Sequence, residues 1–121
     1  MSFKDLSEWF RKLREVSETY PVLVEGRRDA QALKRFGVRN VITLSGKRFA
    51  DVVDLLEERA EGVVLLCDLD PKGERISTRI GQLLRSQGFL VFEEFREYLR
   101  EKGIIHIEDL TEVRYGKNKD P

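Results

Sequence analysis

Cysteine and histidine are almost missing from this sequence of 121 residues, which holds one of each, Cys67 and His106. A single cysteine excludes an internal disulfide and any zinc site built from several cysteines. A single histidine leaves no material for a His-rich metal site and little for a Ser-His-Asp triad. No apolar run approaches the roughly 20 residues that cross a bilayer, and the first residues show no signal-peptide core. We therefore expect a cytoplasmic protein that does not contact membranes.

What the sequence has in quantity is charge, with 36% charged and 40% apolar residues, which is typical of a globular chain. The length predicts one domain over residues 1–121, with a core large enough to fold without disulfide bonds or a structural metal ion. The zero net charge hides an asymmetry. Residues 1–50 hold 11 Lys and Arg against 6 Asp and Glu, and residues 51–121 hold 11 against 16. The basic stretch 26–50 is either a solvated helix face or a surface that contacts phosphates.

Apolar periodicity predicts an α/β fold. Helical spacing favours helices over 3–20, 29–36, 48–60, from the loop at 68–73 to about 87, and over 93–102. Short apolar runs predict strands at 22–24, 40–44, 63–67 and 89–92, and a short extended piece at 103–107. This alternation indicates a Rossmann-like, doubly wound sheet of about four parallel strands with helices on both faces. The last residues, 115–121, are expected to fray.

Acidic residues follow two of the predicted strands. Glu25 ends the first strand, and Asp68 and Asp70 follow the third. Ligands of such sheets bind beyond the carboxyl ends of the strands, and carboxylates placed there suit Mg²⁺. The glycines beside them, Gly26 and Gly73, would let the backbone approach a phosphate closely. The alternative for the aspartates is an Asx turn that caps the next helix.

Other motifs with similar letters fail at specific positions. Lys72 and Arg79 stand where a calcium-binding EF-hand needs acids. Gly46 and Lys47 are followed by Arg48, which excludes a phosphate-binding P-loop. A D-x-D motif of the haloacid-dehalogenase type is a closer rival, but Pro71-Lys72-Gly73 follows the second aspartate here. A small-molecule phosphatase is therefore the third-ranked hypothesis.

The combination Val24-Glu25-Gly26-Arg27-Arg28-Asp29, Ser45-Gly46 and Asp68-Leu69-Asp70-Pro71-Lys72-Gly73 resembles a Toprim domain. The resemblance covers about residues 20–95, with a leading amphipathic helix over 1–19 and a C-terminal helix and tail over 96–121. The chain as a whole is similar to the small stand-alone Toprim proteins of archaea and thermophilic bacteria. The Toprim family includes topoisomerases, primases and nucleases, so the resemblance implies chemistry on nucleic acid.

The resemblance also implies a role for each matching residue. Glu25 would act as general acid or base, and Asp68 and Asp70, together with Glu25, would hold Mg²⁺ or Mn²⁺. Asp29 would cap its helix first and support the site second. Gly26, Gly46 and Gly73 would support the site through their backbone. The residues expected to contact phosphates are Arg27, Arg28, Lys47, Lys72 and Arg75.

Two functions remain open on these residues. A topoisomerase needs a nucleophilic tyrosine on another domain, and primases and recombination mediators carry zinc modules that one cysteine cannot build. The first hypothesis is therefore Mg²⁺-dependent phosphodiester hydrolysis of RNA or DNA, by a nuclease or the catalytic subunit of one. The alternative is a non-catalytic adaptor that binds nucleic acid or a nucleotide together with a partner protein. The partner could also be a second copy of the chain, in a homodimer.

Three residues outside these motifs have simple interpretations. Cys67 is expected to be an inert core residue. His106, between two isoleucines, is predicted to be a partly buried packing residue rather than a ligand. Trp9 either anchors the leading helix on the core or marks a partner surface.

Overall fold

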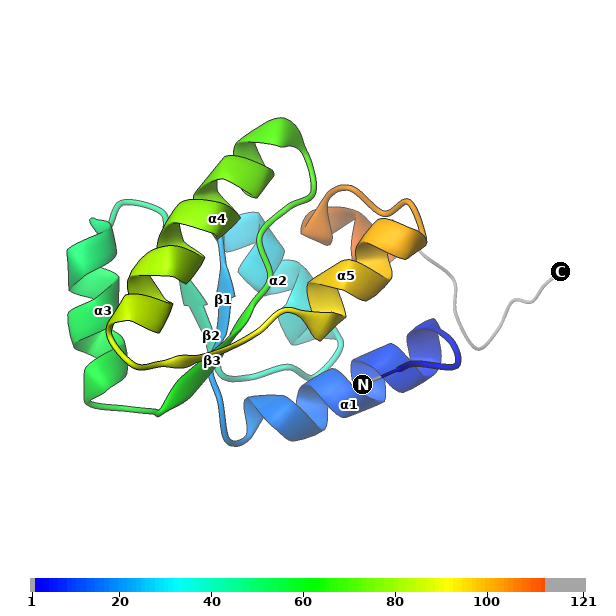
Figure 1. The fold of residues 1–121 in the computed structure, drawn as a ribbon. Helices are drawn as coiled ribbons and strands as arrows, with labels where there is room; N and C mark the ends of the chain where they lie inside the picture. The colour runs from blue at the N-terminus through cyan, green and yellow to red at the C-terminus, as the bar shows by residue number, and fades with distance from the viewer. Residues whose placement is uncertain (1, 113–121) are drawn as a thin grey trace, which may run out of the picture.

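The computed structural model describes residues 2–112, which form a parallel sheet with helices on both of its faces (Figure 1). The four strands are β1 (Val22–Val24), β2 (Val41–Thr43), β3 (Gly62–Leu65) and β4 (Leu90–Phe92), in the order β2-β1-β3-β4. The α-helices are α1 (Leu6–Ser17), α2 (Arg27–Arg35), α3 (Phe49–Glu57), α4 (Pro71–Ser86) and α5 (Glu94–Glu101). A 3₁₀ helix, η1 (Ile107–Glu112), follows them. The predicted four-stranded α/β fold is confirmed.

The two faces of the sheet are covered by different helices, because side chains alternate along each strand. In β1, Val22 and Val24 pack against α1, α2, α5 and η1. Leu23, between them, packs against α3 and α4 on the opposite face. Both central strands are fully buried, which explains why their sequences are continuous apolar runs. Cys67 lies in this interior, and burial raises the pKa of its thiol to about 12, so it is the inert core residue that we expected.

Helix α1 is capped by Asp5, whose side chain accepts a hydrogen bond from the Glu8 amide at 2.9 Å. Two local predictions are wrong. Helix α2 starts earlier than predicted, after Gly26, so that Asp29 is its third residue instead of its N-cap. The predicted extended piece at 103–107 is not a strand, and η1 follows from Ile107. The tail at 115–121 lies outside the described residues.

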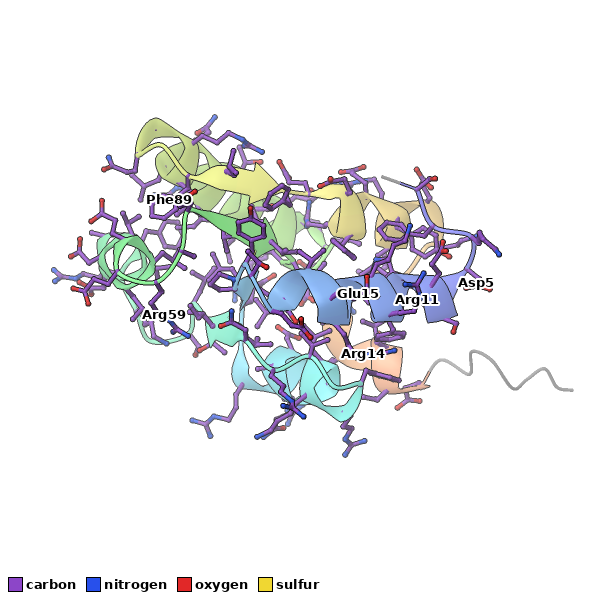
Figure 2. The ribbon with its side chains drawn as sticks, turned by 90° about the horizontal axis from the view of Figure 1, so that it is seen from below. Asp5, Arg11, Arg14, Glu15, Arg59 and Phe89 are labelled. Atoms are coloured by element: carbon purple, nitrogen blue, oxygen red, sulfur yellow. The ribbon has the colours of Figure 1, made fainter. Side chains whose placement is uncertain are left out.

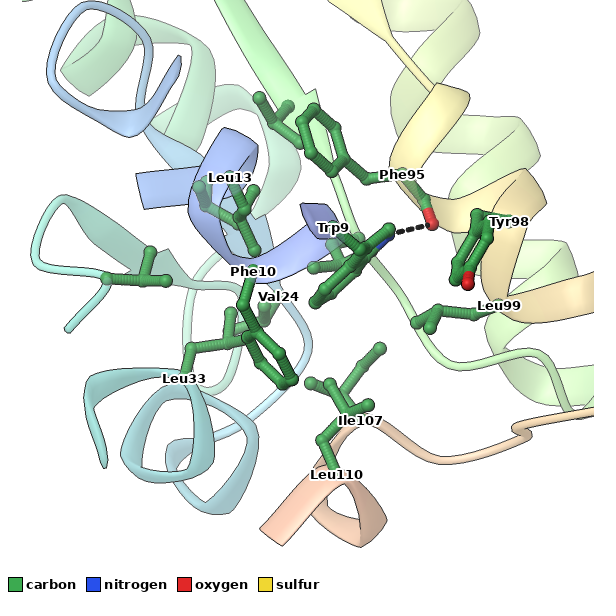
Figure 3. Close-up of a cluster of buried hydrophobic side chains, with 14 of the residues drawn as sticks. Trp9, Phe10, Leu13, Val24, Leu33, Phe95, Tyr98, Leu99, Ile107 and Leu110 are labelled. Atoms are coloured by element: carbon green, nitrogen blue, oxygen red, sulfur yellow. Dashed lines mark hydrogen bonds between the residues drawn. The ribbon is translucent and has the colours of Figure 1, made fainter. Parts of the chain in front are cut away.

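Helix α1 is anchored by Trp9, which is fully buried beneath α5 (Figure 3). The indole Nε1 donates a hydrogen bond to the carbonyl oxygen of Phe95 at 2.9 Å, and the two rings meet edge to face at 5.8 Å. Next to it, the ring of Phe10 stacks on Phe36 of the α2 end at 4.0 Å. Trp9 is therefore a packing anchor, and the alternative of an exposed partner surface is wrong. No helix within residues 2–112 has the length and apolarity to span a bilayer.

Replacing Trp9 with Phe should destabilise the fold by about 1–3 kcal/mol, because the Phe95 carbonyl loses its buried donor and a cavity forms. Urea unfolding followed by circular dichroism measures the change. Ser7→Ala, at an exposed position of the same helix, is the matched control and should change stability little. Equal stability of the Trp9→Phe variant and the wild type would contradict the anchoring role.

Candidate functional site

The candidate site lies at the carboxyl edge of the sheet, where the two central strands end. Glu25 directly follows β1, and Asp68 follows the buried residues that extend β3. The Asp68 amide donates a hydrogen bond to Oε2 of Glu25 at 2.8 Å. Neighbouring parallel strands carry their carboxyl ends to the same edge, and this bond joins the two acidic ends directly.

The turn Asp68-Leu69-Asp70 presents its two carboxylates on one side. Leu69, between them, is buried in the core beneath the turn. Asp70 is the N-cap of α4, and its Oδ1 accepts a hydrogen bond from the Gly73 amide at 2.7 Å. The capping role of Asp70 is real, but it uses only one of the two oxygens. One ligand atom each from Asp68, Asp70 and His106 lie within 4.8 Å of one another.

Gly73 is required by the close packing of α4 on the two strand ends. A Cβ at this position would lie 2.1 Å from the Asp68 carbonyl oxygen and 2.9 Å from Oε2 of Glu25. Both distances are shorter than van der Waals contact, so no other residue fits without moving the turn. The turn glycine Gly46 has φ +75°, which favours glycine for a different reason. Gly26, in contrast, has only Asp29 Oδ2 near its Cβ position, at 4.0 Å.

The segment between α5 and η1 lies against the turn and brings His106 to it. The Ile107 amide donates to Oδ1 of Asp68 at 2.8 Å, and the Leu69 amide donates to the Ile105 carbonyl at 2.7 Å. His106, held between these two bonds, places Nε2 3.2 Å from Oδ2 of Asp70. The prediction that His106 is a packing residue is wrong, because its contacts are with carboxylates. The sequence gives no local signal for this approach, since main-chain atoms make it.

A buried arginine supports the turn from below. Arg96 of α5 is 2% exposed, and its guanidinium donates to the carbonyl oxygens of Cys67 at 2.8 Å and Asp68 at 2.7 Å. Its charge is balanced by Glu74 at 3.0 Å. Glu74 also pairs with Arg100, and the hydrogen bonds from Arg100 and Arg96 lower the pKa of Glu74 to about 2. A charged residue next to Phe95 on an otherwise apolar helix face was the only sequence signal for this role.

The acids of the site differ in their electrostatic state. Burial raises the pKa of both Glu25 and Asp68, reinforced by neighbouring carboxylates and opposed by their backbone hydrogen bonds. Burial and the charge of Asp68 raise the pKa of Asp29 to about 6. Asp70 behaves oppositely, because the hydrogen bond from Gly73 lowers its pKa. Burial opposes protonation of His106, but Asp68 and Asp70 outweigh it and raise the pKa of the imidazole.

A groove of about 530 Å³ opens beside Glu25 and Asp68. Three of the five predicted phosphate contacts line it, namely Arg27, Arg28 and Lys72, and Asp29 lies at its wall. The other two do not. Lys47 donates to the Thr43 carbonyl at 2.9 Å, and Arg75 is an exposed residue of α4 outside the lining.

Other arginines lie at the opposite edge of the sheet, which Figure 2 shows from below. A second groove there, of about 770 Å³, is lined by Arg11, Arg14, Arg39 and Arg59. Most of these arginines form ion pairs or hydrogen bonds with other residues of the chain. Arg11 pairs with Glu15 at 3.0 Å, Arg14 donates to the Phe36 carbonyl and Arg59 to Asn40. The basic stretch 26–50 therefore does not form one surface, because Arg27 and Arg28 lie at the candidate site and Arg39 at the other edge.

Proteins of similar sequence occur in archaea. The chain is 38% identical over 103 residues to a UPF0292 protein of Pyrococcus abyssi, covering 82% of this chain and 76% of that one. It is 29% identical over 113 residues to a UPF0292 protein of Methanocaldococcus jannaschii, covering 89% and 88%.

Two solved structures resemble the fold. A putative protein from Aquifex aeolicus is 53% identical, with a TM-score of 0.87 over 88% of this chain and 99% of that chain. The zinc-binding and RNA polymerase domains of the Aquifex aeolicus primase match with 26% identity and a TM-score of 0.52. This match covers 85% of the present chain but 27% of the primase chain, so it concerns one part of that enzyme.

The sequence model of the Toprim domain matches residues 21–107. The matched range begins one residue before β1 and includes Glu25, Asp68, Asp70 and His106, and it runs past the end expected near residue 95. It spans more than half of the chain, and it agrees with the parallel sheet and with the likeness to the primase. The chain belongs to the Toprim domain family.

Proposed function

We propose that the protein acts on nucleic acid as a divalent-metal-dependent phosphodiesterase, with Asp68 and Asp70 as metal ligands and Glu25 as the group that moves a proton. The observation that carries the proposal is the convergence of the three carboxylates at the ends of β1 and β3, beside a groove with Arg27, Arg28 and Lys72.

The carboxylate oxygens fit a hard divalent cation. Oδ1 of Asp68 and Oε2 of Glu25 accept backbone hydrogen bonds, and these bonds fix the direction of each carboxylate. Within the described part of the chain, Oδ2 of Asp68 and Oε1 of Glu25 accept none. Oxygen ligands with fixed directions suit Mg²⁺ and Mn²⁺. Glu25 does not join the close group formed by Asp68, Asp70 and His106, which supports a role in proton transfer more than one in tight coordination.

The residues divide the chemistry between them. A bound cation would polarise the phosphodiester and lower the pKa of the attacking water. Glu25 is half-buried, and its raised pKa lets it take up and release a proton near neutral pH more readily than an exposed glutamate. Arg27, Arg28 and Lys72 are exposed and would position the phosphates by charge. Gly73 and Arg96 keep the turn and Glu25 in place.

Cleavage of labelled single- and double-stranded RNA and DNA, with Mg²⁺, Mn²⁺ or a chelator, tests this function. Glu25→Gln keeps an acceptor for the Asp68 amide but cannot carry a proton, so the rate should fall by about 100-fold or more. Asp68→Asn/Asp70→Asn should abolish metal-dependent cleavage. Glu61→Gln, an exposed acid at the opposite edge of the sheet, is the control and should behave as wild type.

Two outcomes would contradict the enzymatic proposal. Cleavage that survives both site variants would come from a contaminant or from another site. Metal-dependent binding without cleavage, lost in the Asp68→Asn/Asp70→Asn variant, would favour the non-catalytic adaptor.

The electrostatics of Asp29 give a separate prediction about stability and pH. Its folded pKa of about 6 lies above that of an unfolded aspartate, so the stability it contributes is present below about pH 4 and is lost as the pH rises through about 6. The free energy of unfolding of Asp29→Asn should therefore increase relative to that of wild type as the pH rises from about 4 to about 8. Thermal unfolding in chelator measures this difference. Asp54→Asn, at an exposed position of α3, is the matched control for the loss of one carboxylate. A stability difference between Asp29→Asn and wild type that does not change with pH would contradict the assignment.

A further inference from the structure

His106 is the one histidine of the chain, and the structure places it where a metal ligand would stand. It comes from the segment after α5, 36 positions away from Asp70 in sequence, and its Nε2 lies 3.2 Å from Oδ2 of Asp70. Its side chain is 43% exposed, so the position does not arise from burial of an apolar ring. The contact needs a reason other than packing.

The main chain on both sides of His106 is hydrogen-bonded to the turn that carries the aspartates. The Ile105 carbonyl accepts from Leu69 at 2.7 Å, and the Ile107 amide donates to Asp68 at 2.8 Å. Ile107 is itself fully buried in the core. These contacts fix the backbone of His106 relative to Asp68 and Asp70, so the imidazole reaches the aspartates from a defined position.

The second ring nitrogen faces another carboxylate. Nδ1 lies 3.6 Å from Oδ2 of Asp109, in the first turn of η1. A histidine that binds a metal through one nitrogen commonly has its other N–H directed at a carboxylate, which fixes the tautomer and the ring orientation. His106 has this arrangement, because its Nε2 faces Asp70 and its Nδ1 faces Asp109.

We propose that His106 is a nitrogen ligand of the metal site, oriented by Asp109, and that it makes the site prefer a divalent transition-metal ion such as Mn²⁺ over Mg²⁺. Mg²⁺ is bound almost entirely by oxygen, whereas transition-metal ions accept imidazole nitrogen readily. This inference rests on the proposed function for the location of the metal, and it adds the identity of the third ligand and the selectivity. The rival role for His106 is that of a counter-charge to the two aspartates.

Binding of Mn²⁺ and Mg²⁺ alone to the full chain, measured by calorimetry, tests the selectivity. Wild type should bind Mn²⁺ more tightly than Mg²⁺. His106→Asn should weaken Mn²⁺ binding by about 10- to 100-fold and change Mg²⁺ binding much less. Asp109→Asn should weaken Mn²⁺ binding by a smaller factor, and Glu101→Gln, an exposed acid of α5, should not change it. Thermal unfolding in chelator confirms that each variant is folded.

Pulsed electron paramagnetic resonance of the Mn²⁺ complex gives a second readout. The wild type should show coupling of Mn²⁺ to an imidazole nitrogen, His106→Asn should lose it, and Asp109→Asn should retain it. Absence of this coupling in wild type, an equal change in Mn²⁺ and Mg²⁺ affinity, or tighter binding of both ions by His106→Asn would overturn the proposal. The last result is the one that a counter-charge predicts.

The two proposals fail differently in these measurements. If Asp68→Asn/Asp70→Asn binds metal as wild type does, the metal site of the proposed function is wrong. If that variant loses binding and His106→Asn does not discriminate between the ions, the metal site stands and the role of His106 is wrong.

Discussion

The hydrogen bond from the Asp68 amide to the Glu25 carboxylate is the interaction on which the candidate site depends. It joins the ends of β1 and β3, sets the direction of the Glu25 side chain, and fixes the start of the turn that holds both aspartates. The first turn of α4 packs so closely on this bond that a Cβ at Gly73 would overlap the Asp68 carbonyl oxygen. Glu25, Asp68 and Gly73 therefore form one structural unit, although the first two lie 43 positions apart in the sequence.

The buried arginine next to this unit does not pair with its carboxylates. Arg96 is the buried cation nearest to the turn, but it donates to the carbonyl oxygens of Cys67 and Asp68 and pairs with Glu74. Its charge is thus balanced elsewhere. Arg28 faces Glu108 at 3.9 Å, across an exposed surface where such a pair contributes little. Burial is the main cause of the raised pKa values of Glu25 and Asp68, and the neighbouring carboxylates add to it. A bound cation would favour the charged forms of both acids, which links the electrostatics to the proposed function.

The sheet and its acidic edge were predictable from the sequence because they follow from local patterns. Continuous apolar runs at 22–24 and 63–67 indicate buried parallel strands, and topology then brings Glu25 and Asp68 to one edge. The start of α2 could not be predicted in the same way. Asp29 accepts a hydrogen bond from the Gly26 amide although it lies inside the helix, and an acid in the first turn satisfies a free amide as well as an N-cap residue does. The approach of His106 was also unpredictable. It depends on the amide of Ile107 and the carbonyl of Ile105, groups that every residue except proline offers alike.

The two aspartates of the turn are not equivalent, and their difference has a physical cause. Asp70 stands at the start of α4, where the short bond from Gly73 and the positive end of the helix favour its charged form. Asp68 lies deeper, and desolvation outweighs the single backbone bond that it accepts from Ile107. Asp68 and Glu25 therefore cost more free energy to ionise than Asp70 does. Under the proposed function, Asp70 would supply a fixed negative charge for the cation, and Glu25, with its raised pKa, would exchange the proton.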